Sequence, residues 1–224
     1  MKKAILLICV VLLNWITFAQ KEAIEKVNLN ELIAETQIQT GNDGQIHLYW
    51  WVPSEYWKVA LSGDPNLTKA DVKAFIEPIR DYTMLMVIRG KVGVFGNISY
   101  ENRDSIRQSL VLIDENEQAH SPIPEKDLNE EIMSILTILK PMMSNMLGQM
   151  GSHVEFYVFS NKNKKGKEIF SPYTSKAVKA RCMGDEVQWR TPLGSLFKKK
   201  HCPVDNEAFK GTWNYCPYHG DKLK

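Results

Sequence analysis

Two short Cys-Pro segments near the C-terminus carry the residue types that bind metal ions. The first reads His201-Cys202-Pro203-Val204-Asp205, and the second reads Cys216-Pro217-Tyr218-His219-Gly220. In each segment two residues separate the cysteine from a second side chain that has a lone pair, so a tight turn can direct both side chains at one ion. Proline stiffens such a turn, and glycine permits its left-handed step. Thiolate, imidazole and carboxylate groups all bind zinc, so this spacing is compatible with a mixed tetrahedral site.

The paired segments resemble the knuckles of a zinc ribbon, in which each knuckle usually reads Cys-Pro-X-Cys-Gly. The resemblance covers residues 201–220 only. It implies a structural zinc ion with four protein ligands, which leaves no open position for a catalytic water. This chain departs from the pattern at the second ligand of each knuckle, and His201 is a spare candidate for the first. The implied ligands are Cys202, Asp205, Cys216 and His219.

The cysteines also allow a second interpretation. The chain has four of them, and Cys9 lies in an N-terminal segment that we expect to be removed. Three then remain, so at least one is free, bound to metal or paired with another chain. In an oxidising compartment Cys202 and Cys216 could form a disulfide across the hairpin, which would keep its shape without a metal. Zinc and disulfide both stay open at this stage, and no role follows for Cys182.

The N-terminus has the three-part order of a secretory signal peptide. Lys2 and Lys3 precede an apolar run over residues 4–16, and small residues stand at Thr17 and Ala19. This order predicts cleavage after Ala19 and export to the periplasm or the medium. The apolar run is shorter than the roughly 20 residues that cross a bilayer, so we expect no integral membrane span after cleavage.

Charge argues against nucleic acid as a partner. The chain has 28 basic and 26 acidic residues, and removal of Lys2 and Lys3 makes the two numbers equal. Nonspecific binding to polyanions rests on a surplus of Lys and Arg, which the mature chain lacks. The basic stretches 162–167 and 198–200 are therefore interpreted as a solvated loop and a linker. A hydrophobic content of 44% suffices for a packed core.

The pattern along the chain predicts an α+β domain built on an antiparallel sheet, because strands come as hairpins and helices as separate insertions. We divide the chain into a signal peptide (1–19), a polar leader (20–44), an α+β domain (45–197) and a zinc-ribbon-like β-hairpin module (198–224). The expected strands are 46–52, 83–88 and 92–100 about a turn at 89–91, 106–113, 154–158, and 176–183 with 186–190. The expected helices begin at Ser54 and at a Thr68–Asp71 capping box, and a long Met-rich helix contains Pro141.

Two clusters have a structural and a functional interpretation. Aromatic rings gather over residues 49–57, and they form either a stacking platform or, more commonly, part of the core. Trp50 and Trp51 point to opposite faces of a strand, so we expect at most one of them to face the core. Methionines on the long helix suggest core filler rather than capture of a soft metal. They are Met133, Met142, Met143, Met146 and Met150.

These features favour an exported, non-catalytic protein that binds a partner protein and carries a structural metal at its C-terminus. The alternative is an enzyme or small-ligand receptor with a pocket beside the aromatic strand and the Met-rich helix, near Trp51, His47 or His153. No paired carboxylates or activated nucleophile support that alternative in the sequence. The sequence therefore leaves enzymatic activity uncertain and less favoured.

Overall fold

The fold is described by a computed structural model that covers residues 19–174 and 177–224. The predicted signal segment falls on residues 1–18 apart from Ala19, so the signal prediction lies outside the described residues. No helix in the described ranges is long and apolar enough to cross a membrane.

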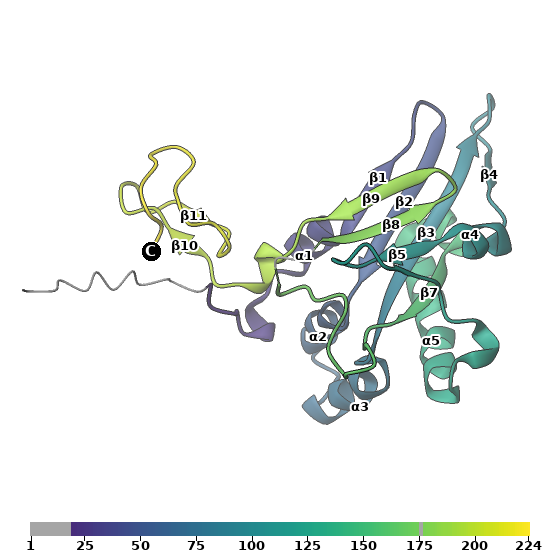
Figure 1. The fold of residues 1–224 in the computed structure, drawn as a ribbon, viewed down its shortest axis with the longest axis horizontal. Helices are drawn as coiled ribbons and strands as arrows, with labels where there is room; N and C mark the ends of the chain where they lie inside the picture. The colour runs from purple at the N-terminus through teal and green to yellow at the C-terminus, as the bar shows by residue number, and fades with distance from the viewer. Residues whose placement is uncertain (1–18, 175–176) are drawn as a thin grey trace, which may run out of the picture.

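Two antiparallel sheets and a layer of helices form the main domain (Figure 1). The first sheet has the order β1-β2-β3-β4, and β7 also pairs with β3; the second has the order β6-β5-β8-β9. This arrangement confirms the predicted α+β class with antiparallel sheets. The strands are β1 (Gln37–Thr40), β2 (Gln45–Val52), β3 (Tyr82–Val92), β4 (Ile98–Tyr100), β5 (Val111–Ile113), β6 (Ala119–His120), β7 (Glu155–Ser160), β8 (Val178–Cys182) and β9 (Asp185–Trp189). The helices are α1 (Leu29–Thr36), α2 (Ser54–Ser62), α3 (Lys69–Ile79), α4 (Arg103–Ser109) and α5 (Glu130–Leu147).

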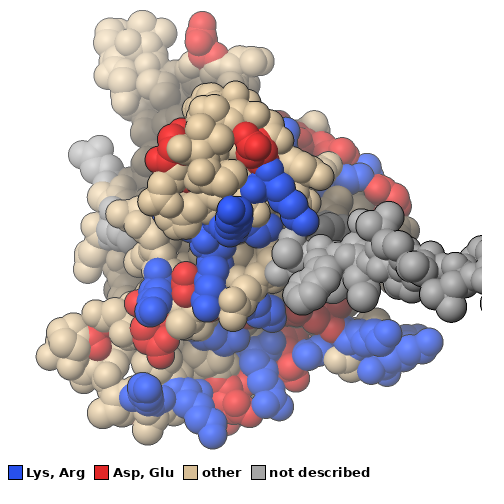
Figure 2. All heavy atoms as spheres, turned by 90° about the vertical axis from the view of Figure 1, so that its left-hand side faces the viewer, with Lys and Arg blue, Asp and Glu red and all other residues tan. Residues whose placement is uncertain are grey.

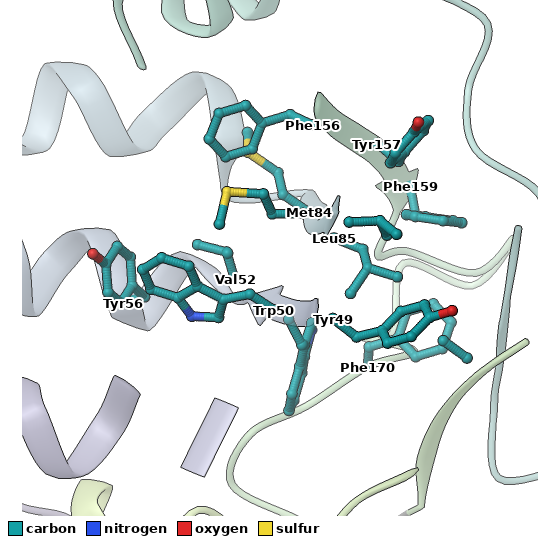
Figure 3. Close-up of a cluster of buried hydrophobic side chains, with 14 of the residues drawn as sticks. Tyr49, Trp50, Val52, Tyr56, Met84, Leu85, Phe156, Tyr157, Phe159 and Phe170 are labelled. Carbon is teal, nitrogen blue, oxygen red and sulfur yellow. The ribbon is translucent and has the colours of Figure 1, made fainter. Parts of the chain in front are cut away.

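Strand β2 is buried on both faces, because helices cover one face of its sheet and the second sheet covers the other. The Trp50 ring meets Tyr56 of α2 edge-on, at 5.2 Å between ring centroids (Figure 3). The Trp51 ring points the opposite way and meets Trp189 of β9 at 6.0 Å. Both Trp50 and Trp51 have no exposed surface. The expectation that only one of them faces the core is wrong, since a sheet between two layers has two core faces.

The indole N–H groups of these rings are satisfied inside the core. Trp50 Nε1 donates to Thr36 Oγ1 at 3.0 Å, and Trp51 Nε1 donates to Thr83 Oγ1 at 2.8 Å. Trp189 Nε1 donates to the carbonyl of Thr36 at 2.6 Å. A buried indole without an acceptor would cost the desolvation of its N–H, so these contacts make the burial of three tryptophans favourable.

The segment 20–44 belongs to the folded domain and is not a separate leader. Strand β1 pairs with β2 over four residues, from Gln37 opposite Trp50 to Thr40 opposite His47. Leu32 of α1 is fully buried, and Asn28 caps that helix by accepting from the N–H groups of Asn30 and Glu31. The domain therefore begins well before the predicted boundary at Gln45, because an amphipathic helix that is short and rich in polar residues still contributes one apolar side to the core.

The strand predicted over 106–113 is instead a helix followed by a short strand. Helix α4 occupies Arg103–Ser109, and β5 covers only Val111–Ile113. Asn102 caps α4 by accepting from the N–H groups of Asp104 and Ser105. The buried residues Ile106 and Leu110 are four apart, which fits a helical face as well as it fits a strand. The capping asparagine decides between the two.

The hairpin after β3 turns later than predicted. Strand β3 continues to Val92, and the chain reverses over residues 93–97 rather than 89–91. The N–H of Gly93 donates to the carbonyl of Asn97 at 2.6 Å, and Gly96 has a φ of 80°. Val94 and Phe95 at this tip are each 97% exposed.

Several other elements follow the sequence closely. The capping box is present: Thr68 Oγ1 accepts from the N–H of Asp71, whose carboxylate accepts from the N–H of Thr68. The closing hairpin is formed by β8 and β9. Helix α5 runs through Pro141 as one helix and is followed by a 3-10 turn over Gly148–His153.

The C-terminal module is a small hairpin of β10 (Lys200–His201) and β11 (Ala208–Phe209). It lies beside the N-terminal end of the described chain and α1 (Figure 1). The chain from Gln20 runs antiparallel to the linker that leads into the module: Lys21 pairs with Phe197, and the N–H of Lys198 donates to the carbonyl of Gln20 at 2.8 Å. The segment just after the predicted cleavage site therefore holds the linker in place.

Candidate metal centre

The two Cys-Pro segments form a pair of matching knuckles. In each, the cysteine is followed four residues later by a residue with positive φ, which is 63° at Asn206 and 75° at Gly220. The sulfur of Cys202 accepts from the N–H of Val204, and the sulfur of Cys216 accepts from the N–H of His219, each at 3.4 Å. The backbone hydrogen bonds of the two knuckles also correspond. In the first, the N–H of Cys202 donates to the carbonyl of Glu207 (2.9 Å), and the N–H of Asn206 donates to the carbonyl of Cys202 (3.0 Å). In the second, the N–H of Cys216 donates to the carbonyl of Asp221 (2.8 Å), and the N–H of Gly220 donates to the carbonyl of Cys216 (2.9 Å).

These knuckles bring three predicted ligands together. One ligand atom each from Cys202, Cys216 and His219 lies within 4.8 Å of the other two. The Nδ1 atom of His219 is 3.5 Å from the sulfur of Cys202 and 3.5 Å from the sulfur of Cys216. Both cysteines are free thiols and buried. The group could therefore hold a metal ion.

The distances suit zinc. An ion bound at about 2.3 Å to sulfur and about 2.0 to 2.1 Å to nitrogen, with tetrahedral angles, separates those two ligand atoms by roughly 3.5 Å. Both sulfur–nitrogen distances have that value. A Cys202–Cys216 disulfide would instead need the two sulfurs at about 2.05 Å, with no requirement on His219. The equal distances to one imidazole nitrogen therefore fit a shared ion better than a cross-link.

The fourth predicted ligand, Asp205, is not one of the three converging residues, although it contacts one of them. Its Oδ2 is 3.8 Å from Nδ1 of His219, and its Oδ1 accepts from the N–H of Glu207 at 3.0 Å. His201, the spare candidate, is directed elsewhere, with Nδ1 at 3.1 Å from the carbonyl oxygen of Asn206. Of the two candidates for a fourth ligand, Asp205 contacts a member of the group, whereas His201 contacts the backbone of Asn206.

Protonation in this group is asymmetric. Burial raises the pKa of Cys202, and the hydrogen bond with Cys216 raises it further. Burial also acts to raise the pKa of Cys216, but the N–H groups of His219 and Tyr218 and the imidazole outweigh it, so this pKa is lowered. The hydrogen bond with Cys216 raises the pKa of His219, with help from the charge of Asp205. The pKa of Cys216 therefore lies below that of Cys202, and Cys216 is the more readily deprotonated of the two thiols.

Little apolar surface supports this module. Its buried cluster consists of Cys202, Cys216 and Leu223, with Phe209 partly buried against it. Phe209 stacks on Trp213 at 5.8 Å and contacts Tyr218 at 6.1 Å between ring centroids. Much of the remaining apolar surface faces solvent: Trp213 is 42%, Tyr215 64% and Tyr218 73% exposed.

The module docks on the main domain through charges and through a close approach at Gly211. Lys199 pairs with Glu31 at 2.7 Å, and Lys210 pairs with Glu35 at 2.5 Å. A Cβ atom on Gly211 would lie 2.1 Å from the carbonyl oxygen of Lys198, so only glycine allows this approach. On the face of the molecule that carries the module, basic and acidic side chains are interspersed (Figure 2).

The aromatic strand offers no comparable site. Its aromatic residues and those that follow it are each 4% exposed or less: Tyr49, Trp50, Trp51, Tyr56 and Trp57. They therefore provide no exposed face for stacking. His153 is instead stacked on Tyr100 at 3.7 Å between centroids, and His47 contacts a carboxylate of the second sheet.

That carboxylate, Asp185, is the centre of a polar cluster that the sequence analysis missed. It accepts from Tyr49 OH at 2.9 Å and Thr40 Oγ1 at 3.2 Å, and it also pairs with Arg89. Nδ1 of His47 lies 2.8 Å from it. Partial burial acts to raise the pKa of Asp185, but Tyr49, Arg89 and His47 outweigh it, so the pKa lies below its usual value. The cluster joins the two sheets, and no spacing in the sequence relates its members.

The chain matches no protein-family model, no curated protein and no solved structure. The zinc-ribbon resemblance therefore rests on the residues of the module and their geometry alone.

Proposed function

We propose that this protein is an exported, non-catalytic binding protein whose C-terminal module is held together by a structural zinc ion. The observation that carries the proposal is the convergence of Cys202, Cys216 and His219 with sulfur–nitrogen distances of 3.5 Å. With Asp205 as fourth ligand the ion has no position left for substrate or water, which favours a structural role. Export is supported by the order of residues 1–19.

A partner protein is the ligand class that we propose for the module. Interfaces are enriched in tyrosine and tryptophan, which bury large areas at small entropic cost. The exposed rings of Trp213, Tyr215 and Tyr218 supply such a surface, and Val204 adds to the exposed apolar area of the module. The zinc ion would fix the two knuckles, which carry Val204 and Tyr218 and which flank Trp213 and Tyr215 in the chain.

Elemental analysis of the purified protein, combined with thiol titration under denaturing conditions, tests the metal. We expect one zinc per chain and, after chelation, three reactive thiols from Cys182, Cys202 and Cys216. No metal together with one reactive thiol would show a Cys202–Cys216 disulfide and overturn the zinc proposal. Replacement of zinc by cobalt tests the ligands, because the visible absorption of a tetrahedral cobalt site depends on them. We expect the absorption to change in Asp205→Asn and to stay unchanged in His201→Ala.

A further inference from the structure

A surface cleft lies far along the chain from the metal centre. It has a volume of about 700 Å3 and lies between the turn after β5 and the hairpin that follows β7. It shares no lining residue with the C-terminal module. The residues that line it are Asp114, Glu115, Asn116, Gln118, His120, Ser160, Lys162, Asn163, Lys164, Lys165, Lys167, Glu168 and Ile169.

The lysine-rich wall of this cleft is an ordered hairpin rather than an irregular loop. The side chain of Asn163 accepts from the N–H groups of Lys165 at 2.9 Å and Lys167 at 3.0 Å. Lys162 pairs with Glu168 across the hairpin, and Gly166 makes the turn with a φ of 71°. The backbone positions of the lysines are therefore set before any ligand binds, which lowers the entropic cost of binding.

Charges in the cleft are unequally compensated. Asp114 accepts from the N–H groups of Asn116 and Gln118 and lies 3.0 Å from Nε2 of His120. Glu168 accepts from Asn161, and Glu115 also has an interaction partner. By contrast, Lys164, Lys165 and Lys167 have no hydrogen bond or ion pair from their side chains within the described residues. Lys162 reaches only Asp81, at 3.7 Å.

We propose that this cleft binds a small organic phosphate or sulfate ester. Ammonium groups are compact donors that recognise tetrahedral oxyanions, and Lys164, Lys165 and Lys167 present three of them. The exposed amide side chains of Asn116 and Gln118 on the opposite wall supply hydrogen bonds to the organic part. The volume suits a ligand of ordinary metabolite size. Four of the residues that line the cleft are lysines, so a near-neutral chain carries a local group of positive charges there.

Titration with glucose 6-phosphate, glucose 6-sulfate and glucose, followed by amide NMR of residues 114–118 and 163–168, tests this site. At low ionic strength we expect at least one ester to bind at these residues and glucose not to bind. Binding of only one ester would identify the oxyanion that the cleft selects. If neither ester shifts these resonances, the proposal is wrong.

Three variants separate a defined site from general attraction to lysines. The triple variant Lys164→Ala, Lys165→Ala, Lys167→Ala should weaken ester binding on the order of tenfold, since each exposed charge contact contributes a modest factor. The matched triple variant Lys69→Ala, Lys73→Ala, Lys126→Ala removes the same charge elsewhere and should change affinity less than twofold. Gln118→Trp fills the cleft without changing charge and should also weaken binding. Equal losses in both triple variants, or full binding in Gln118→Trp, would overturn the site.

Discussion

The main domain and the C-terminal module reach a folded state by different means. The main domain buries one large cluster that includes Trp50, Trp51 and Trp189, each at most 1% exposed. The module buries only Cys202, Cys216 and Leu223. A chain segment as short as 198–224 cannot bury enough apolar surface to offset its conformational entropy, and such segments usually need a metal or a disulfide. If the proposed ion is bound, the module's stability resides in its metal ligands, whereas the domain's stability resides in packing.

Removal of the metal should have the largest effect, and this effect should be confined to the module. Cys216→Ser should abolish zinc binding and unfold the module while the main domain keeps its own thermal transition, because structural zinc contributes apparent binding energies of about 10–16 kcal/mol. Metal content and proteolysis within residues 198–224 measure the effect. His201→Ala is the control and should keep one zinc per chain. A Cys216→Ser module as resistant to protease as the wild type would contradict the proposed role of the ion.

The reverse perturbation is Trp51→Ala in the main domain. The change removes the ring contact with Trp189 and the hydrogen bond to Thr83. We expect a loss of about 3–5 kcal/mol in the free energy of unfolding, measured by urea denaturation. Zinc content at temperatures below the transition should stay unchanged. Trp213→Ala, at a ring that is 42% exposed, serves as control and should cost much less. Loss of zinc in folded Trp51→Ala would show that the two regions are not independent.

A smaller effect is expected at the polar cluster between the sheets. Asp185→Asn should lower the free energy of unfolding by about 1.5–3 kcal/mol at neutral pH, because a charged acceptor of several hydrogen bonds is lost. The folded pKa of Asp185 is depressed. Its contribution is therefore present above the unfolded pKa of about 3.9 and disappears as the pH falls through the folded value.

Stability curves of wild type and Asp185→Asn measured across acidic pH test this sign. The two curves should converge as the pH falls below about 4. Glu186→Gln, at an exposed neighbour that pairs with Arg181, is the control and should change stability by less than about 1 kcal/mol. A difference between wild type and Asp185→Asn that is constant with pH would show that the carboxylate charge contributes nothing.

The smallest effect is expected where the two regions touch. Gly211→Ala places a Cβ against the carbonyl of Lys198 and should weaken docking of the module by about 1–2 kcal/mol, with zinc retained. Hydrogen exchange at the linker residues 196–198 measures this docking. Gly63→Ala meets no atom closer than 3.8 Å and should leave exchange there unaltered. Unchanged exchange in Gly211→Ala would mean that the contact does not hold the module.

Local signals were sufficient where the determinants lie close together in the chain. The capping box at Thr68 and Asp71 needs only neighbouring residues, and so does the closing hairpin of β8 and β9. Local signals were insufficient over 106–113, where two buried residues four apart fit a helix and a strand equally. They also failed for 20–44, since the value of a weakly apolar helix depends on what it packs against.

The knuckles of the candidate metal centre are the most local feature of all. Each knuckle spans five residues, so the sequence by itself determined which side chains could converge: Cys202, Asp205, Cys216 and His219. The structure brings Cys202, Cys216 and His219 together and leaves Asp205 beside His219, whereas His201 contacts the carbonyl of Asn206.

Burial of both tryptophans and the assembly of the Asp185 cluster were decided only by the tertiary structure. Asp185 meets Tyr49 across 136 positions of the chain. Such contacts depend on how two sheets stack. The alternation of side chains along one strand indicates only that the strand has two faces. The sequence alone determined the chemistry available and the class of fold. Which faces are covered, and which distant side chains meet, followed from packing that no single segment contains.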